Sequence, residues 1–167
     1  VESGLWTAIK ERPFGRVPEP GTTPSALFLT CTDTEPLCAS VSKCSEGKEE
    51  DFAAGVKALS SLADTVYLCV EPGSSLAKHA SGNVQVEEFG GIHPAGLAGT
   101  HIHMLHGASR KRTAWHIHLQ DIIAVGHLLR TGQLSVERII SLAGPIVSNP
   151  RLLRTRIGAE TAALVDG

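Results

Sequence analysis

The stretch "SALFLTCTDTEPLCA" (residues 25–39) decides the fold class. After Pro24 it begins as an unbroken run of apolar and small residues, which is typical of a strand buried on both faces of a sheet. Such strands belong mostly to parallel sheets, because helices cover both of their faces. The run ends in polar residues from Asp33 onward. The sequence therefore predicts an α/β protein whose first strand ends near Asp33.

The next segments alternate between helix-like and strand-like patterns. A helix is expected over residues 49–64, which carry acids in the first turn and apolar residues at helical spacing. A second buried strand is expected at 65–70, a short helix at 74–80 and an alternating strand at 83–89. Strand and helix in alternation indicate parallel βαβ units with right-handed crossovers. Residues 26–89 are therefore interpreted as half of a doubly wound sheet.

The remaining segments of the chain differ in their residue patterns. Turn residues dominate residues 1–25, so an irregular arm is expected there. "THIHML" (100–105) and "TAWHIHL" (113–119) are interpreted as two strands, with the basic run 110–112 as a solvated hairpin tip. A helix is expected over 120–132, with Gly132 after its last turn. Strands follow at 137–144 and 150–158, and a boundary near Gly144 starts a second, mostly β module over residues 144–167.

The turn after the first strand argues against dinucleotide binding. A phosphate-binding turn needs glycines directly after that strand, so that backbone amides can approach the pyrophosphate. Here the turn "CTDTEPLCA" (31–39) has no glycine, and Asp33 and Glu35 would repel phosphate. No Walker loop and no GxSxG nucleophile elbow occur either. The sheet is expected to be nucleotide-like in shape without being a nucleotide site.

Composition narrows the class of protein further. Of the 167 residues, 42% are hydrophobic and 19% are charged, which fits a globular chain with an aliphatic core. The net charge of −2 does not indicate a nucleic-acid partner, since such partners are usually bound by a basic surface. Cys31 and Cys69 lie in apolar runs, and no CxxC pair occurs, so a reducing cytoplasm is expected. No apolar stretch approaches about 18 residues.

Two histidine pairs leave two interpretations open. His101 and His103 form one pair, and His116 and His118 form the other. If both segments are strands, each pair projects from one face, and four imidazoles could hold zinc. The alternative is that these histidines lie on half-exposed strand faces and bond to their neighbours, since only Asp121 is nearby as a further ligand. A stand-alone metal-binding domain is the weaker hypothesis.

Several long motifs resemble one protein family. "GGIHPAGLAGTHIHML" (90–105) and "LAGPIVSNPRLLRTRIGA" (142–159) are similar to segments of the A subunit of the bacterial sodium-translocating NADH:quinone reductase. The segment that starts at Trp115 and continues into Gln120 and Asp121, the early "SGLWTAIKERPFGRVP" (3–18) and "ALFLT" (26–30) agree in order with that family. Ile92 stands where the family loop usually has proline, and the pair His116 and His118 is particular to this sequence.

The resemblance implies a fold, a location and partners. It implies that this chain is the central fragment of the subunit, with a Rossmann-like domain over residues 26–143 that lacks a phosphate loop. The start of a β-grasp-like module over residues 144–167 follows. The subunit is implied to be peripheral, on the cytoplasmic face of the inner membrane, in a complex that oxidises NADH, reduces ubiquinone and pumps sodium. NADH, flavins and iron–sulfur are implied to belong to other subunits, with no cofactor bound to this fragment.

A quinone contact is the site that the resemblance suggests. A quinone head needs an apolar slot and one or two hydrogen-bond donors to its carbonyl oxygens. The glycine-rich loop and its neighbours are expected to supply them, and an indole is expected to stack on the ring. The candidates are His93, Gly96, His101, His103 and Trp115. A docking module without any small ligand, facing sibling subunits through residues 90–107 and 151–156, remains open beside it.

Overall fold

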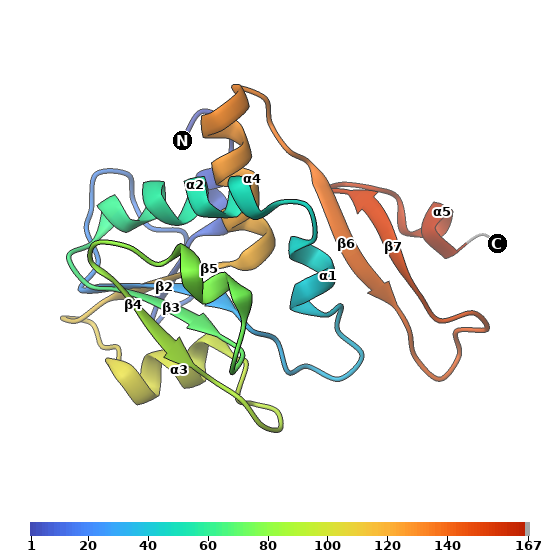
Figure 1. The fold of residues 1–167 in the computed structure, drawn as a ribbon, viewed down its shortest axis with the longest axis horizontal. Coiled ribbons are helices and arrows are strands. Elements are labelled where there is room, and N and C mark those ends of the chain that lie inside the picture. The colour runs from blue at the N-terminus through green and yellow to red at the C-terminus, as the bar shows by residue number, and fades with distance from the viewer. Residues whose placement is uncertain (166–167) are drawn as a thin grey trace.

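The computed structural model describes residues 1–165 and contains two sheets (Figure 1). The strands are β1 (Lys10–Arg12), β2 (Ala26–Cys31), β3 (Val66–Val70), β4 (Val84–Glu88), β5 (Ala114–His118), β6 (Glu137–Leu142) and β7 (Arg151–Arg156). The α-helices are α1 (Val41–Ser45), α2 (Glu49–Leu59), α3 (Ala98–Leu105), α4 (Leu119–Thr131) and α5 (Thr161–Val165). Short 3₁₀ helices occupy Leu5–Ala8, Ser60–Leu62 and Ser75–His79.

The main sheet is mixed and five-stranded, in the order β1-β5-β2-β3-β4. Strands β5, β2, β3 and β4 are parallel, and β1 pairs antiparallel with β5 at one edge. The buried strands expected from residue 25 to near Asp33 and at 65–70 are confirmed as β2 and β3, as is the α/β class. Residues 10–12, expected within an irregular arm, form β1 instead, because the free edge of β5 offers backbone partners to them.

Two helices on one face of the sheet pack closely through glycines (Figure 1). α2 and α4 make the most extensive contact between helices in the described chain. A Cβ on Gly55 would lie 2.1 Å from the carbonyl oxygen of Ile122, and one on Gly126 would lie 1.7 Å from that of Asp51. Glycine at both positions therefore lets the two backbones approach each other. The main core fills the space between this helix pair and the sheet.

The segment 100–105, expected to be a strand, is part of helix α3 instead. The chain leaves β4 and returns to β5 parallel to it, and a parallel connection needs a crossover rather than an adjacent strand. α3 lies on the sheet face opposite α2 and α4 (Figure 1). It buries His101 and Ile102 there, and Leu105, three residues after Ile102, packs against the same core cluster, which is the spacing of one helix face. The expected helix at 120–132 is confirmed: Gly132 has φ of 74° and its N–H bonds to the Leu128 carbonyl at 2.8 Å.

The last two strands form a separate hairpin. β6 pairs antiparallel with β7, from Glu137 opposite Arg156 to Leu142 opposite Arg151. The boundary expected at 143/144 falls in the loop between these two strands, so it divides a hairpin. The positions of the domain boundaries stay predictions. Among residues 1–165, no helix has the length and apolar character needed to cross a bilayer.

Candidate functional site

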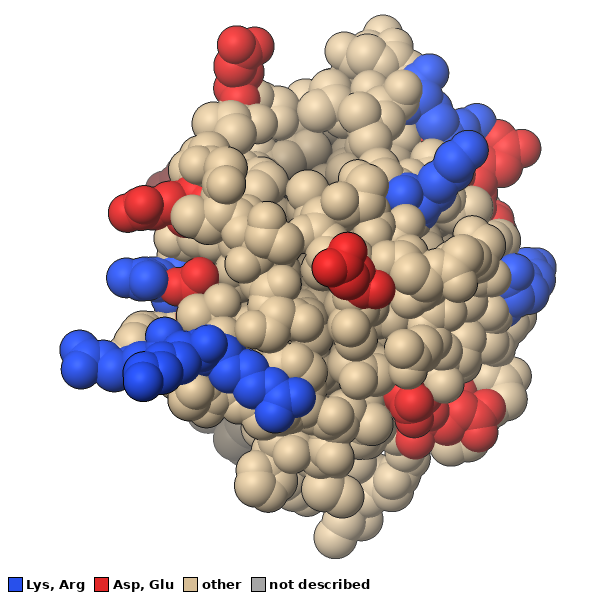
Figure 2. All heavy atoms as spheres, turned by 90° about the vertical axis from the view of Figure 1, so that its left-hand side faces the viewer, with Lys and Arg blue, Asp and Glu red and all other residues tan. Residues whose placement is uncertain are grey.

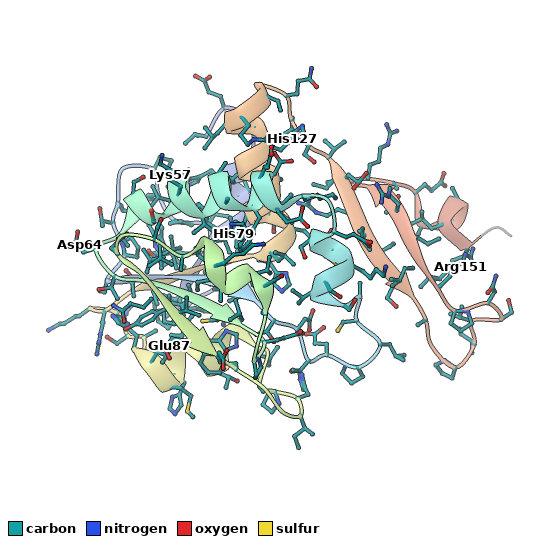
Figure 3. The ribbon with its side chains drawn as sticks, in the orientation of Figure 1. Lys57, Asp64, His79, Glu87, His127 and Arg151 are labelled. Carbon is teal, nitrogen blue, oxygen red and sulfur yellow. The ribbon has the colours of Figure 1, made fainter. Side chains whose placement is uncertain are left out.

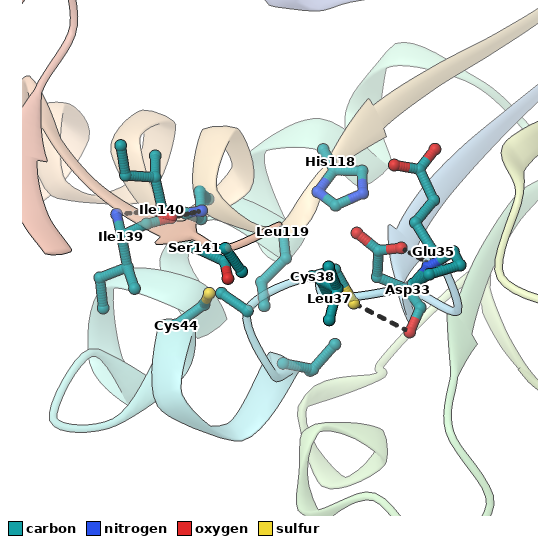
Figure 4. A pocket seen from close by; sticks show the side chains of 15 residues that line it. Asp33, Glu35, Leu37, Cys38, Cys44, His118, Leu119, Ile139, Ile140 and Ser141 are labelled. Carbon is teal, nitrogen blue, oxygen red and sulfur yellow. Dashed lines mark hydrogen bonds between the residues drawn. The ribbon is translucent and has the colours of Figure 1, made fainter. Parts of the chain in front are cut away.

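A pocket of about 410 Å³ opens at the carboxyl ends of β2 and β5 (Figure 4). These two strands are parallel neighbours, but the chain leaves β2 toward β3 on one side and enters β5 on the other. Such a reversal of strand order leaves a crevice, and open α/β sheets bind their ligands in it. We call this cavity the switch-point pocket. Its position makes it the candidate binding site of the domain.

Two carboxylates and one thiol from the loop after β2 line one wall of the switch-point pocket. Asp33 and Glu35 contribute the carboxylates, and an oxygen of Asp33 accepts a hydrogen bond from the Glu35 N–H at 2.9 Å. The Cys38 thiol lies 3.7 Å from the Asp33 carbonyl oxygen. Burial, followed by the nearby Asp33 carboxylate, raises the pKa of Cys38, so this thiol stays protonated. The wall suits a neutral or cationic ligand better than a phosphate.

The rest of the lining comes from the end of β5, the start of α4 and β6. His118 and Leu119 end β5 and begin α4, and Ile140 and Ser141 belong to β6 (Figure 4). Gln120 fixes β6 in place, because its side-chain amide donates to the Ile139 carbonyl at 2.9 Å and accepts from the Ile139 N–H at 2.8 Å. These two bonds satisfy the Ile139 backbone in the way that a neighbouring strand would. The hairpin therefore closes the pocket that the main sheet opens.

Ion pairs add to the contact between the hairpin and the main sheet. Arg138 pairs with Asp121 on α4, and Glu137 pairs with Lys48 ahead of α2. Burial raises the pKa of Asp121, and the Arg138 guanidinium opposes that effect. The Lys48 ammonium lowers the pKa of Glu137. Both contacts hold β6 over the switch-point pocket.

The glycine-rich loop rests on the segment that follows β2. The Gly96 N–H donates to the Thr34 hydroxyl at 2.8 Å, and the His93 Nδ1 lies 3.4 Å from the same oxygen. A Cβ on Gly96 would lie 2.5 Å from the Thr34 backbone nitrogen, so only glycine fits this approach. The structure thus brings His93 and Gly96, two of the expected quinone residues, together at Thr34. Thr34 directly follows Asp33, which lines the switch-point pocket.

Helix α3 separates the other two histidines of the expected quinone set. His101 is fully buried, stacks on Phe89 with 4.1 Å between ring centroids, and has its Nε2 2.9 Å from the Ala95 carbonyl oxygen. Burial lowers its pKa, so the ring is neutral near pH 7. His103, two residues on, is exposed. Two residues span about 200° on a helix, so the two rings point in different directions.

Trp115, the fifth expected quinone residue, lies in the main core. It has no exposed surface, and its Nε1 donates to a Glu11 carboxylate oxygen at 3.2 Å. Its ring meets Trp6 edge to face at 5.6 Å between centroids. Trp115 packs with the core under α2 and α4, whereas His101 lies on the α3 side of the sheet. None of the five expected residues lines the switch-point pocket.

Comparison with known proteins places the chain in a family. The model described as the NqrA second alpha/beta domain matches residues 1–134. The chain belongs to the NqrA family. A second model, the NQRA C-terminal domain, matches residues 139–167.

Curated relatives agree with this family membership. The A subunit of Na(+)-translocating NADH-quinone reductase from Shewanella amazonensis is 46% identical over the whole chain, and that from Pseudomonas aeruginosa PAO1 is 47% identical. The corresponding protein of Tolumonas auensis is 50% identical over 95% of the chain. The chain spans 36–37% of the length of these three relatives.

Within the described residues, the two histidine pairs do not come together as a metal centre. His116 and His118 lie on one face of β5, but His101 and His103 belong to a helix. Across residues 1–165, no group of three or more histidine, cysteine or acidic side chains is placed to hold a metal ion. The alternative of a stand-alone metal-binding domain is therefore not favoured.

Sequence reasoning did not single out the switch-point pocket as a site. It noted Asp33 and Glu35 only as residues that repel phosphate, and it assigned His118 to the metal hypothesis. Cys38, Cys44 and the β6 residues were missed. The signal that was available is topological: parallel β2 and β5 end at the same edge of the sheet, so the residues that follow them converge.

The lowered pKa of His116 predicts a loss of stability in mild acid. Burial and the positive charge of Arg12 lower its pKa from 6.5 to about 4 in the folded chain. Below pH 6.5 the unfolded chain therefore binds the proton more readily than the folded one, and stability falls as pH decreases toward 4. We expect the free energy of unfolding to be about 2 kcal/mol lower near pH 5 than near pH 8 from this group. Urea unfolding at both pH values measures it.

The control for this prediction is His116→Gln, which keeps a polar side chain at the position without the titration. The variant should lose less stability between the two pH values, by about 2 kcal/mol. Identical pH dependence in both proteins would show that His116 is not held neutral by the fold.

Proposed function

We propose that this chain is the central α/β part of a peripheral subunit of a sodium-translocating NADH:quinone reductase. The match of residues 1–134 to the NqrA domain is the observation that carries the proposal, and the names of the relatives agree with it. In this proposal the subunit lies on the cytoplasmic face of the bacterial inner membrane. NADH, flavins and iron–sulfur centres belong to sibling subunits, which are its partners.

Within that complex, the main sheet is a Rossmann-like scaffold that does not bind a nucleotide. The proposal rests on the place where such a fold holds its pyrophosphate, the turn after β2. That turn offers the Asp33 and Glu35 carboxylates to the switch-point pocket and contains no glycine. A flavin or dinucleotide seated against residues 31–38 would contradict the scaffold role. We propose further that β6 and β7 start a β-grasp-like module, with its boundary ahead of β6.

Quinone binding is assigned in this proposal to the outer surface of the glycine-rich loop and α3. His93 and His103 are exposed there and can donate to a quinone carbonyl oxygen. Ile92 is 89% exposed and Met104 is 70% exposed, so apolar surface for a quinone ring lies on the same two segments. His101, Gly96 and Trp115 support this surface or the core instead of contacting the ring.

Titration with a short-chain ubiquinone tests this assignment through backbone amide chemical shifts. We expect shifts in residues 90–97 and around His103, and little change at Trp115, which lies in the core. Gly96→Ala should weaken binding about tenfold or more, because the clash with Thr34 displaces the loop.

The matched control is Gly99→Ala, since a Cβ there meets nothing within 4 Å. Gly99 lies within α3 itself, so this variant should lose less quinone affinity than Gly96→Ala does. If sub-millimolar quinone moves no amide in the loop or α3, the quinone role fails for this chain. The exposed Ile92 and Met104 would then favour the competing role, a surface that docks onto a sibling subunit.

A further inference from the structure

The basic run of the sequence forms an exposed tip between α3 and β5. Ser109 and Arg112 exchange backbone hydrogen bonds of 2.9 and 3.1 Å, which hold Arg110 and Lys111 at a tight turn. All three basic residues are exposed. Figure 2 looks at this side of the molecule and shows Lys and Arg side chains gathered in a row low on the face. The proposed function makes no use of this feature.

The charges of this tip are not neutralised by neighbouring acids. Within residues 1–165, Arg110, Lys111 and Arg112 form no ion pair, whereas Arg16 and Arg138 each pair with a carboxylate. Arg112 donates through Nε to His106 at 3.3 Å, which leaves its charge in place. The tip therefore presents three uncompensated positive charges on a chain whose net charge is −2.

An exposed aromatic ring lies beside these charges. Phe14, in the arm between β1 and β2, is 63% exposed. The guanidinium carbon of Arg110 lies 6.0 Å from the centroid of its ring. We call Phe14, Arg110, Lys111 and Arg112 the basic rim. Aromatic and cationic side chains side by side match the interfacial layer of a bilayer, where rings lie among headgroups and cations meet phosphates.

We propose that the basic rim docks on a membrane surface through anionic phospholipid headgroups. The acidic net charge of the chain does not prevent this, because charges more than about 10 Å away are screened at ordinary ionic strength. Nucleic acid fits the rim less well, because its sites extend along the strand and offer aromatic rings to successive bases. The rim instead offers three charges and one aromatic ring at a single turn. The proposal does not depend on quinone binding, so the two can fail separately.

Co-sedimentation with vesicles tests the proposal. The chain is mixed at about 0.1 M salt with vesicles of phosphatidylcholine and phosphatidylglycerol in equal parts, and with phosphatidylcholine vesicles alone. Binding is expected only to the anionic vesicles and should weaken steeply with added salt. The triple variant Arg110→Gln, Lys111→Gln, Arg112→Gln should bind about a hundredfold more weakly, from about fivefold per lost charge. Phe14→Ala should weaken binding about fivefold.

The matched control removes the same charge elsewhere. Lys57, Lys78 and Arg156 are exposed and form no ion pair within the described residues. Lys57 lies on α2, which covers the sheet face opposite α3 (Figure 3). Their triple change to glutamine should alter vesicle binding by less than about threefold. Circular dichroism shows whether each variant is folded.

Three results would overturn the proposal. One is the lack of a preference for anionic vesicles, either because both kinds bind equally or because neither binds at millimolar lipid. Another is an equal loss in both triple variants, which would indicate a response to net charge rather than to the basic rim. The third is a tighter, rim-dependent complex with single-stranded RNA at the same salt, which would assign the surface to nucleic acid.

Discussion

Replacing Gly126 with alanine is expected to lower the free energy of unfolding by about 3 kcal/mol or more. The new methyl group would lie 1.7 Å from the Asp51 carbonyl oxygen and 2.6 Å from the Gly55 nitrogen, so helices α2 and α4 would have to separate. Asp51 resists that movement, because its carboxylate bonds to His127 on α4 at 2.9 Å and to Arg130. These bonds outweigh its burial and lower its pKa.

Thermal and urea unfolding measure the effect, with an expected fall in Tm of about 6–12 °C. Gly99→Ala is the matched control, since it also adds one methyl group within a helix but meets open space. That variant should be neutral or slightly more stable, because alanine favours helix. A Gly126→Ala protein as stable as the Gly99→Ala protein would mean that α2 and α4 do not pack through glycine.

Trp115→Ala should cost about 3–5 kcal/mol of stability, the usual penalty for emptying a fully buried aromatic site. The indole is completely inaccessible, and its Nε1 satisfies Glu11, a carboxylate that is only 7% exposed. Removing it leaves both a cavity and a buried acceptor with one partner fewer; Arg16 still pairs with that carboxylate at 2.8 Å. Urea unfolding followed by circular dichroism measures the loss.

Trp115→Phe separates the two contributions and tests the quinone hypothesis. It keeps an aromatic ring near Trp6 but removes the Nε1 donor, so a smaller loss of about 1–3 kcal/mol is expected. Quinone affinity should not change in the phenylalanine variant if the core role is correct. A variant with wild-type stability and weakened quinone binding would instead support stacking of Trp115 on the ligand.

The strands and helices with strong, local signals were predictable. β2 and β3 are largely apolar because both of their faces are covered, and α4 carries its apolar face and its glycine cap in its own sequence. Residues 98–105 lacked such a signal. His-x-His fits a strand face, and only the need for a crossover between parallel β4 and β5 makes the segment a helix.

The candidate site was less predictable than the fold. The sequence alone determined the acidic, glycine-free character of the turn after β2, since Asp33, Glu35 and the absence of glycine are local facts. Family membership was also readable from long motifs in order, and the matched domain confirms it.

Only the tertiary structure decided what surrounds that turn. Parallel pairing of β2 with β5 brings His118 to Asp33 and Glu35 across more than eighty residues, and Gln120 then docks β6 over the same pocket. The tertiary structure also buried Trp115 and turned His101 away from His103. These outcomes depend on contacts between segments far apart in the chain, which local propensity and periodicity do not encode.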